Sequence, residues 1–105
     1  MGAVSEQHGR ELWISLASLL RSYTAAYGLN RQQQATVELS DTRILVRCGE
    51  RWLYLERNAG EIAGMTQTGQ RFRWWWSDAG ELMTETGGST PMDLQAEEWS
   101  RELVA

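Results

Sequence analysis

The sequence is short of the residues on which most protein chemistry depends. It has one histidine, one cysteine, one proline and no lysine. A single cysteine excludes a disulfide within the chain, which suits a reducing compartment. No apolar run reaches the length of a membrane-spanning helix, and the first residues lack the basic and then apolar pattern of a signal peptide. We therefore expect a cytoplasmic protein with no membrane partner.

The few candidate catalytic or metal-binding side chains do not form a recognisable set. His8 lies near the start of a predicted helix and Cys48 near the end of a predicted strand, so they are a poor nucleophile–base pair. Glu97, Glu98 and Glu102 have the spacing of a solvated helix face. None of the glycines forms a phosphate-binding loop ahead of a helix. The sequence therefore predicts no enzyme activity, no catalytic residue, no metal site and no cofactor.

What the chain does have is enough apolar and aromatic residues for a core. Of its 105 residues 42% are hydrophobic, and they include six tryptophans. The charged fraction of 23% is ordinary for a folded domain. We expect one domain over residues 1–105.

The charges are unevenly distributed along the chain. All ten basic residues are arginine, which codon bias in a GC-rich bacterial genome explains. Residues 42–77 carry a net charge of +3 and residues 78–105 a net charge of −6, within a total of −4. Arginine tolerates stacked and bidentate contacts better than lysine does. The basic middle segment is therefore the place to look for a binding surface.

Hydrophobic periodicity predicts a helix, then strands, then a second helix. Apolar residues recur at helical spacing over about residues 5–27. The period changes to two within residues 35–86. Thr90 and Pro91 then open a helix over about residues 91–103, because proline suits the first helical position. The predicted fold class is α+β, with an N-terminal amphipathic helix, an antiparallel β-meander of about five or six strands, and a C-terminal helix.

Short turns divide the meander and fix its register. The six predicted strands cover residues 35–39, 42–48, 51–57, 61–67, 70–76 and 81–86. We expect two-residue turns at 40–41, 49–50 and 68–69. A turn of known length determines which residues lie opposite each other. The pairs that follow include Val37 with Ile44, Val46 with Leu53, Met65 with Phe72, and Ala63 with Trp74.

This register divides the strand residues between two faces. The first face is apolar and should pack against the N-terminal helix. Its members are Val37, Leu39, Ile44, Val46, Leu53, Leu55, Met65, Phe72 and Trp74. The second face combines arginine with tryptophan and tyrosine. Its candidate partner-binding residues are Arg47, Trp52, Tyr54, Arg71, Arg73 and Trp75.

Two explanations of this second face remain open. The C-terminal helix could cover it, so that two helices sandwich the sheet and arginine stems pack over indole rings. Otherwise the face is open, and it is rich in the residue types that dominate protein interfaces.

An open face of this kind suggests a small non-enzymatic protein-binding module of the inhibitor, immunity or chaperone type. A homodimer could use the same face, with the acidic C-terminal helix of one copy against the basic strands of the other. The alternative is a single-stranded nucleic-acid-binding domain, in which rings stack on bases and arginines contact phosphates. The net negative charge disfavours that alternative. Nothing specific supports a third use, as a tryptophan platform for a small ligand or carbohydrate.

Overall fold

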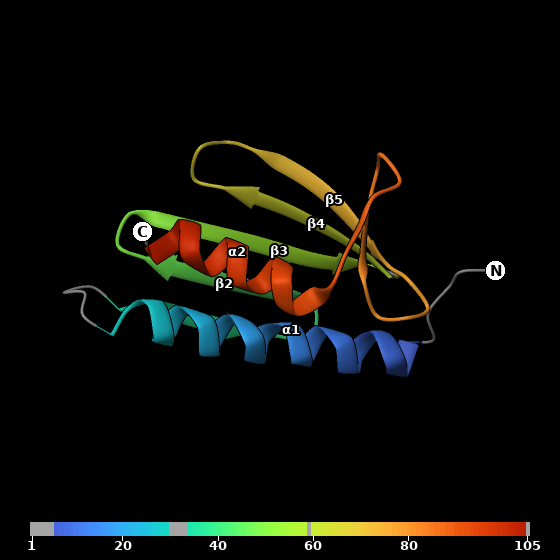
Figure 1. The fold of residues 1–105 in the computed structure, drawn as a ribbon, viewed down its shortest axis with the longest axis horizontal. Coiled ribbons are helices and arrows are strands. Elements are labelled where there is room, and N and C mark those ends of the chain that lie inside the picture. Colours follow the sequence, from blue (N-terminus) through green and yellow to red (C-terminus); the bar gives the residue numbers. More distant parts are fainter. Residues whose placement is uncertain (1–5, 30–33, 59, 105) are drawn as a thin grey trace.

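The computed structural model describes residues 6–29, 34–58 and 60–104. Its elements are α1 (Glu6–Tyr27), β1 (Thr36–Leu39), β2 (Arg43–Cys48), β3 (Arg51–Asn58), β4 (Glu61–Thr66), β5 (Arg71–Trp76), β6 (Leu82–Thr84), β7 (Ser89–Thr90) and α2 (Met92–Val104). The strands form one antiparallel sheet in chain order (Figure 1). The predicted α+β class and the order helix, meander, helix are confirmed.

The strand count was predicted too low. The described residues form seven strands, and β7 lies outside the predicted range of 35–86. It is only two residues long and pairs Ser89 with Met83. A pair so short leaves no alternating pattern in the sequence, so periodicity alone could not reveal it.

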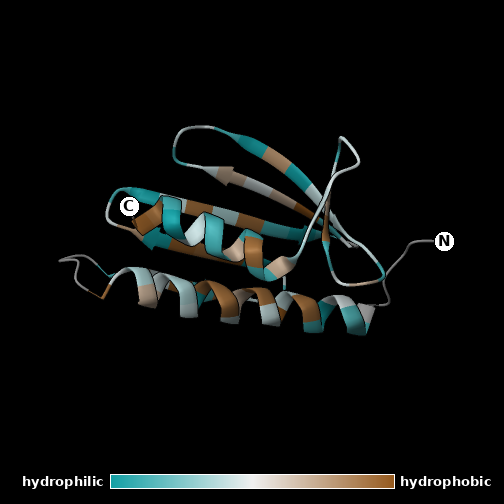
Figure 2. Cartoon of the chain, viewed as in Figure 1, coloured by the Kyte–Doolittle hydropathy of each residue, from teal (hydrophilic) through white to brown (hydrophobic). Residues whose placement is uncertain are grey.

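Both helices lie on the same side of the sheet. In Figure 1, α1 and α2 run next to each other in front of the strands. Along each helix, bands of hydrophobic residues recur among hydrophilic ones (Figure 2). The hydrophobic bands of both helices join one core with a single face of the sheet. The described residues therefore form two layers, and the second helix does not cover the opposite face of the sheet.

The core between these layers confirms the predicted apolar face in most positions. Its buried residues are Trp13, Leu16, Ala17 and Leu20 of α1, Ile44, Val46, Cys48, Leu53, Leu55, Ile62, Trp76 and Leu82 of the sheet, and Ala96, Trp99, Leu103 and Val104 of α2. At the edge of this core, Phe72 stacks on Trp99 and Trp74 meets both rings edge-on. Burial of this apolar surface is the main source of stability. Neither helix of the described ranges combines the length and apolar character needed to cross a bilayer.

The register of the β2–β3 hairpin is as predicted. Val46 pairs with Leu53, and a two-residue turn joins the strands. Gly49 in this turn has φ 64°, which a residue other than glycine adopts at a cost. The predicted register of β1 and β2 is wrong by two residues, because Val37 pairs with Val46. There Ser40 closes a longer loop, in which its hydroxyl accepts a hydrogen bond from the Arg43 amide at 3.1 Å. A shift of two leaves each side chain on its predicted face.

The predicted register of β4 and β5 is wrong by one residue. Gly64, not Met65, lies opposite Phe72, and Ile62 lies opposite Trp74. The loop holds three residues, and it closes with the Gly69 amide donating to the Thr66 carbonyl at 2.9 Å. A shift of one reverses the face of every residue on β4. Met65 therefore points away from the helices, and Ile62 takes a place in the core.

The same three-residue loop closes three successive hairpins. Its third residue is Gly69, Gly80 or Gly87, each with φ between 80° and 90°. Each of these glycine amides donates to the carbonyl three residues earlier, on Thr66, Ser77 or Thr84. This is the usual three-residue hairpin, in which a tight turn is followed by a left-handed residue. The pattern Ser/Thr-x-x-Gly therefore marks these turns in the sequence.

Candidate functional site

The strand residues that point away from the helices form a surface that we call the open face. All six candidate residues lie on it: Arg47, Trp52, Tyr54, Arg71, Arg73 and Trp75. No helix of the described residues covers it. Its arginines are exposed, while its aromatic rings are half-buried against their neighbours. The sandwich arrangement considered above is therefore wrong, and these side chains reach solvent.

The open face contains a shallow apolar depression over β2, β3 and β4. Its volume is about 450 Å³, and its lining residues are Leu45, Arg47, Trp52, Tyr54 and Met65. The backbone places them together, since Arg47 pairs with Trp52, Leu45 with Tyr54, and Tyr54 with Met65. Shallow hollows lined by aromatic and aliphatic side chains are where the anchors of protein interfaces usually bind.

Two lining residues of the depression were missing from the sequence prediction. Met65 was assigned to the core because of the one-residue error in the β4–β5 register. Leu45 is not among the candidate residues, because an isolated leucine is unremarkable beside arginine and tryptophan. The signal that would have located Met65 is the Thr-x-x-Gly pattern from Thr66 to Gly69, which implies a three-residue loop.

A hydrogen bond and an ion pair fix one wall of the depression. The Tyr54 hydroxyl donates to Glu56 Oε2 at 3.1 Å, and the Arg43 guanidinium lies 3.6 Å from the same oxygen. Burial of the phenol, and then its hydrogen bond to Glu56, raise the pKa of Tyr54 above its ordinary value. The tyrosine is therefore held neutral and oriented by groups beside the depression.

Arg73 and Trp75 lie in a separate part of the open face. Arg73 is opposite Ala63, and its Nε is 3.0 Å from Glu61 Oε1. Trp75 lies between Glu61 and Met83, whose exposed fraction is 38%. The structure thus brings four of the six predicted residues to the depression or its edge. Arg73 and Trp75 lie outside it, and Arg73 is paired with Glu61.

The arginines of the open face differ in their partners. Arg43 and Arg73 each face a glutamate. Within the described ranges, Arg47 and Arg71 have no ion pair or hydrogen bond through their guanidinium groups. Arg47 lines the depression, and Arg71 lies directly opposite Met65. The unneutralised positive charge of the face is therefore concentrated around the apolar depression.

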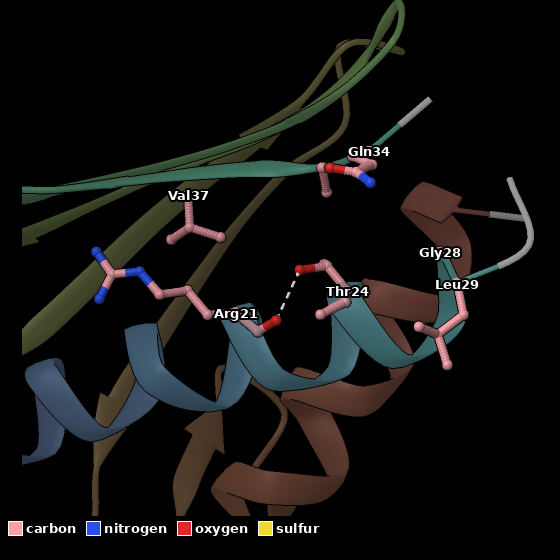
Figure 3. Close-up of a pocket in the computed structure, with 8 residues that line it drawn as sticks. Arg21, Thr24, Gly28, Leu29, Gln34 and Val37 are labelled. Carbon is pink, nitrogen blue, oxygen red and sulfur yellow. Dashed lines mark hydrogen bonds between the residues drawn. The ribbon is translucent and has the colours of Figure 1, made fainter. Parts of the chain in front are cut away.

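A second hollow, of about 440 Å³, lies between the end of α1 and the start of β1 (Figure 3). Thr24 is one of its lining residues, but its hydroxyl already donates to the Leu20 carbonyl at 2.6 Å. Leu29 and Gln34 line it too, and the residues that join them lie outside the described ranges. The hollow therefore offers no set of converging polar groups that indicates a ligand.

The other candidate side chains of the sequence, Cys48 and His8, lie outside the open face. Cys48 is buried, with 8% of its surface exposed, as expected for a small core residue. His8 is exposed on α1. Among the described residues, no three histidine, cysteine or acidic side chains gather closely enough to hold a metal ion.

Comparison with models of protein families, with curated proteins and with solved structures finds no match for this chain.

Proposed function

We propose that this chain is a small non-enzymatic protein-binding module, of the inhibitor, immunity or chaperone type, whose binding surface is the open face. One observation carries the proposal: both helices lie on the other side of the sheet, so the apolar depression and its arginines face solvent. A folded domain rarely exposes tryptophan, tyrosine, leucine and methionine together without a use for them.

The chemistry of the face indicates what a partner must present. An apolar or aromatic side chain would fill the depression beside Trp52 and Tyr54, as an anchor does at the centre of an interface. One or more carboxylates would neutralise Arg47 and Arg71, which have no partner within the described part of the chain. Opposite charges across an interface also raise the rate of association. The expected partner is therefore a protein surface with an apolar centre and at least one carboxylate beside it.

A single-stranded nucleic acid is the competing ligand for the same face. Rings and arginines on a sheet can stack on bases and contact phosphates. Such binding depends on positive potential over a long path, and two of the four arginines here are already paired with glutamate. The net charge of −4 adds a general repulsion. We therefore favour a protein partner, acting in the cytoplasm, where a chain with one cysteine needs no disulfide.

Affinity capture with a matched pair of variants tests the proposal. The purified full chain and its Arg47→Glu/Trp52→Ala variant serve as baits in an extract of the native cell. A Leu94→Ala/Glu98→Arg variant, altered on exposed positions of α2, is the control. We expect a protein that the unaltered chain and the control retain and the face variant loses, with direct binding reproduced from purified components.

Two results would count against the proposal. A face variant that stays folded and keeps the partner would show that binding uses another surface. Retention of oligonucleotides that falls steeply with added salt, with no protein retained, would favour the nucleic-acid alternative.

A further inference from the structure

The central row of the open face has opposite charges at its two ends. Across β1 to β5, successive strand pairs align the side chains Glu38, Leu45, Tyr54, Met65 and Arg71. The three middle side chains, those of Leu45, Tyr54 and Met65, are half-buried and largely apolar. The two charged side chains at the ends of the row are exposed. Neither Glu38 nor Arg71 has an ion pair within the described ranges. The row is thus apolar in the centre, negative at β1 and positive at β5.

A row of this kind is complementary to itself. We propose that the open face binds a second copy of this chain, face to face, about a two-fold axis that runs parallel to the strands over Tyr54. This inference rests on the proposed function and names its partner. The axis reverses the row, so that Glu38 of each copy lies opposite Arg71 of the other. Leu45 of each copy then lies over Met65 of the other, and the two Tyr54 rings meet at the centre.

The neighbouring row is compatible with this arrangement. Arg43, Glu56 and Ala63 occupy it on β2, β3 and β4. Reversal brings Arg43 of one copy over the small Ala63 of the other, where there is room for its side chain. The two Glu56 carboxylates approach each other, but each is already engaged by its own Arg43 and Tyr54. A two-fold axis across the strands is less favourable, because Arg47 would then face Arg43 of the other copy.

A face-to-face contact is complete with two copies of the chain. A contact between α2 of one copy and the open face of another is not. α2 lies on the side of the sheet opposite to the open face. If the acidic α2 of one copy packed on the open face of the next, each copy would still present one unused surface. Such head-to-tail contacts continue into a filament unless they close in a ring, whereas a two-fold contact is complete with two copies.

The experiment is sedimentation velocity of the full chain at low salt, from micromolar to millimolar concentration. The variants are Glu38→Arg, Arg71→Glu and the double variant Glu38→Arg/Arg71→Glu, with Glu98→Arg on α2 as the control. By symmetry each single change replaces two attractions with two repulsions. We expect each to raise the dimer dissociation constant by about tenfold or more. The double variant restores opposite charges at both ends of the row, so it should dimerise nearly as well as the unaltered chain.

Each outcome decides for or against a second copy. The dimer is supported if both single variants lose dimerisation, the double variant recovers it and the control dimerises as the unaltered chain does. A chain that is monomeric throughout the range, or a dimer that the single variants leave unchanged, would overturn it. A foreign partner that binds the face would be lost with Arg71→Glu but would not return in the double variant. If capture gives that pattern and sedimentation shows only monomer, the dimer is excluded and the proposed protein-binding function stands. If neither self-association nor a captured protein is found, both proposals fail.

Discussion

At the scale of single residues, Gly64 is needed because of its neighbour across the sheet. It lies opposite Phe72, whose ring covers the glycine backbone and stacks on Trp99. A Cβ atom added at Gly64 would overlap Cζ of that ring. The ring could move only by giving up its contact with Trp99. No local pattern in the sequence indicates this requirement, because the ring that imposes it is eight residues further along the chain.

Replacing Gly64 by alanine should therefore destabilise the protein. We expect a loss of about 1–3 kcal/mol in the free energy of unfolding, as for other overpacked sites, measured by urea denaturation. Gly88→Ala is the matched control, because the nearest atom to its added Cβ is 3.4 Å away and its φ is not positive. The second change Phe72→Leu should recover part of the loss. Equal effects at both glycines would show that the close approach to Phe72 is not the cause.

Tyr54 offers a second test at this scale. Burial and the hydrogen bond to Glu56 raise its pKa, so the folded state holds the phenolic proton more tightly than the unfolded state. The resulting stabilisation is present below the ordinary pKa of about 10 and is lost as the pH rises through the higher pKa of the folded state. Glu56→Gln should move the pKa of Tyr54 back toward its ordinary value. The measurement is tyrosinate absorbance as the pH is raised. Subtracting the titration of Tyr54→Phe isolates the contribution of Tyr54.

An unchanged titration in Glu56→Gln would mean that the carboxylate does not hold the phenol in solution. Glu85→Gln, in the turn between β6 and β7, is the control and should have no effect on the difference spectrum.

At the scale of elements, what the sequence predicted depended on loop length. The β2–β3 register came out right because Gly49 begins a two-residue turn, and its length leaves one pairing. The predicted β4–β5 register is wrong because a two-residue turn at Thr68 and Gly69 omits Gln67, which belongs to the loop as well. Both turns contain a glycine beside a polar residue, so residue type alone does not distinguish a two-residue loop from a three-residue loop. A single residue of loop length reverses a face, so this error moved Met65 from the predicted core to the candidate site.

Periodicity also could not decide which face each helix covers. The apolar stripe of α2 shows which side of that helix is buried, but not against what. The choice between a sandwich and two layers depends on the long-range packing of α2 beside α1, and no local pattern records it. This is why the open face could be named from the sequence while its exposure could not.

Adjacent residues of β5 provide a test of the two faces. Trp76 is in the core, with 3% of its surface exposed, whereas Trp75 lies on the open face. Trp76→Ala should cost about 3–5 kcal/mol in the free energy of unfolding, the usual range for a buried aromatic. Trp75→Ala should cost about 1 kcal/mol or less. Denaturation curves of the two variants are compared directly, and a larger loss at Trp75 would contradict the assignment of faces.

At the scale of the whole molecule, the two sides of the sheet differ in their charges. The helical layer includes α2, with its acidic residues Asp93, Glu97, Glu98 and Glu102. The open face has four arginines, two of them paired with glutamate. A partner that carries negative charge is therefore attracted to one side and repelled by the other. This separation orients an approaching partner before contact, and added salt should weaken the effect.

The two parts of the open face should contribute unequally to binding. Arg47 has no partner among the described residues and lies beside Trp52 in the depression, whereas Arg73 is already neutralised by Glu61 at 3.0 Å. The double variant Arg47→Glu/Trp52→Ala removes a half-buried aromatic ring and reverses an unpaired charge. We expect it to lower affinity by about a hundredfold or more, which corresponds to roughly 3 kcal/mol.

The matched variant Arg73→Glu/Trp75→Ala makes the same two kinds of change outside the depression. We expect this variant to lower affinity by about tenfold or less. Arg73 is already paired with Glu61 within the molecule, and exposed ion pairs contribute little. Titration calorimetry with the captured protein, or sedimentation for self-association, gives both affinities once thermal melts show that the variants are folded. If the Arg73/Trp75 variant loses more than the Arg47/Trp52 variant, the partner binds over β5 and β6, and the depression is not the centre of the interface.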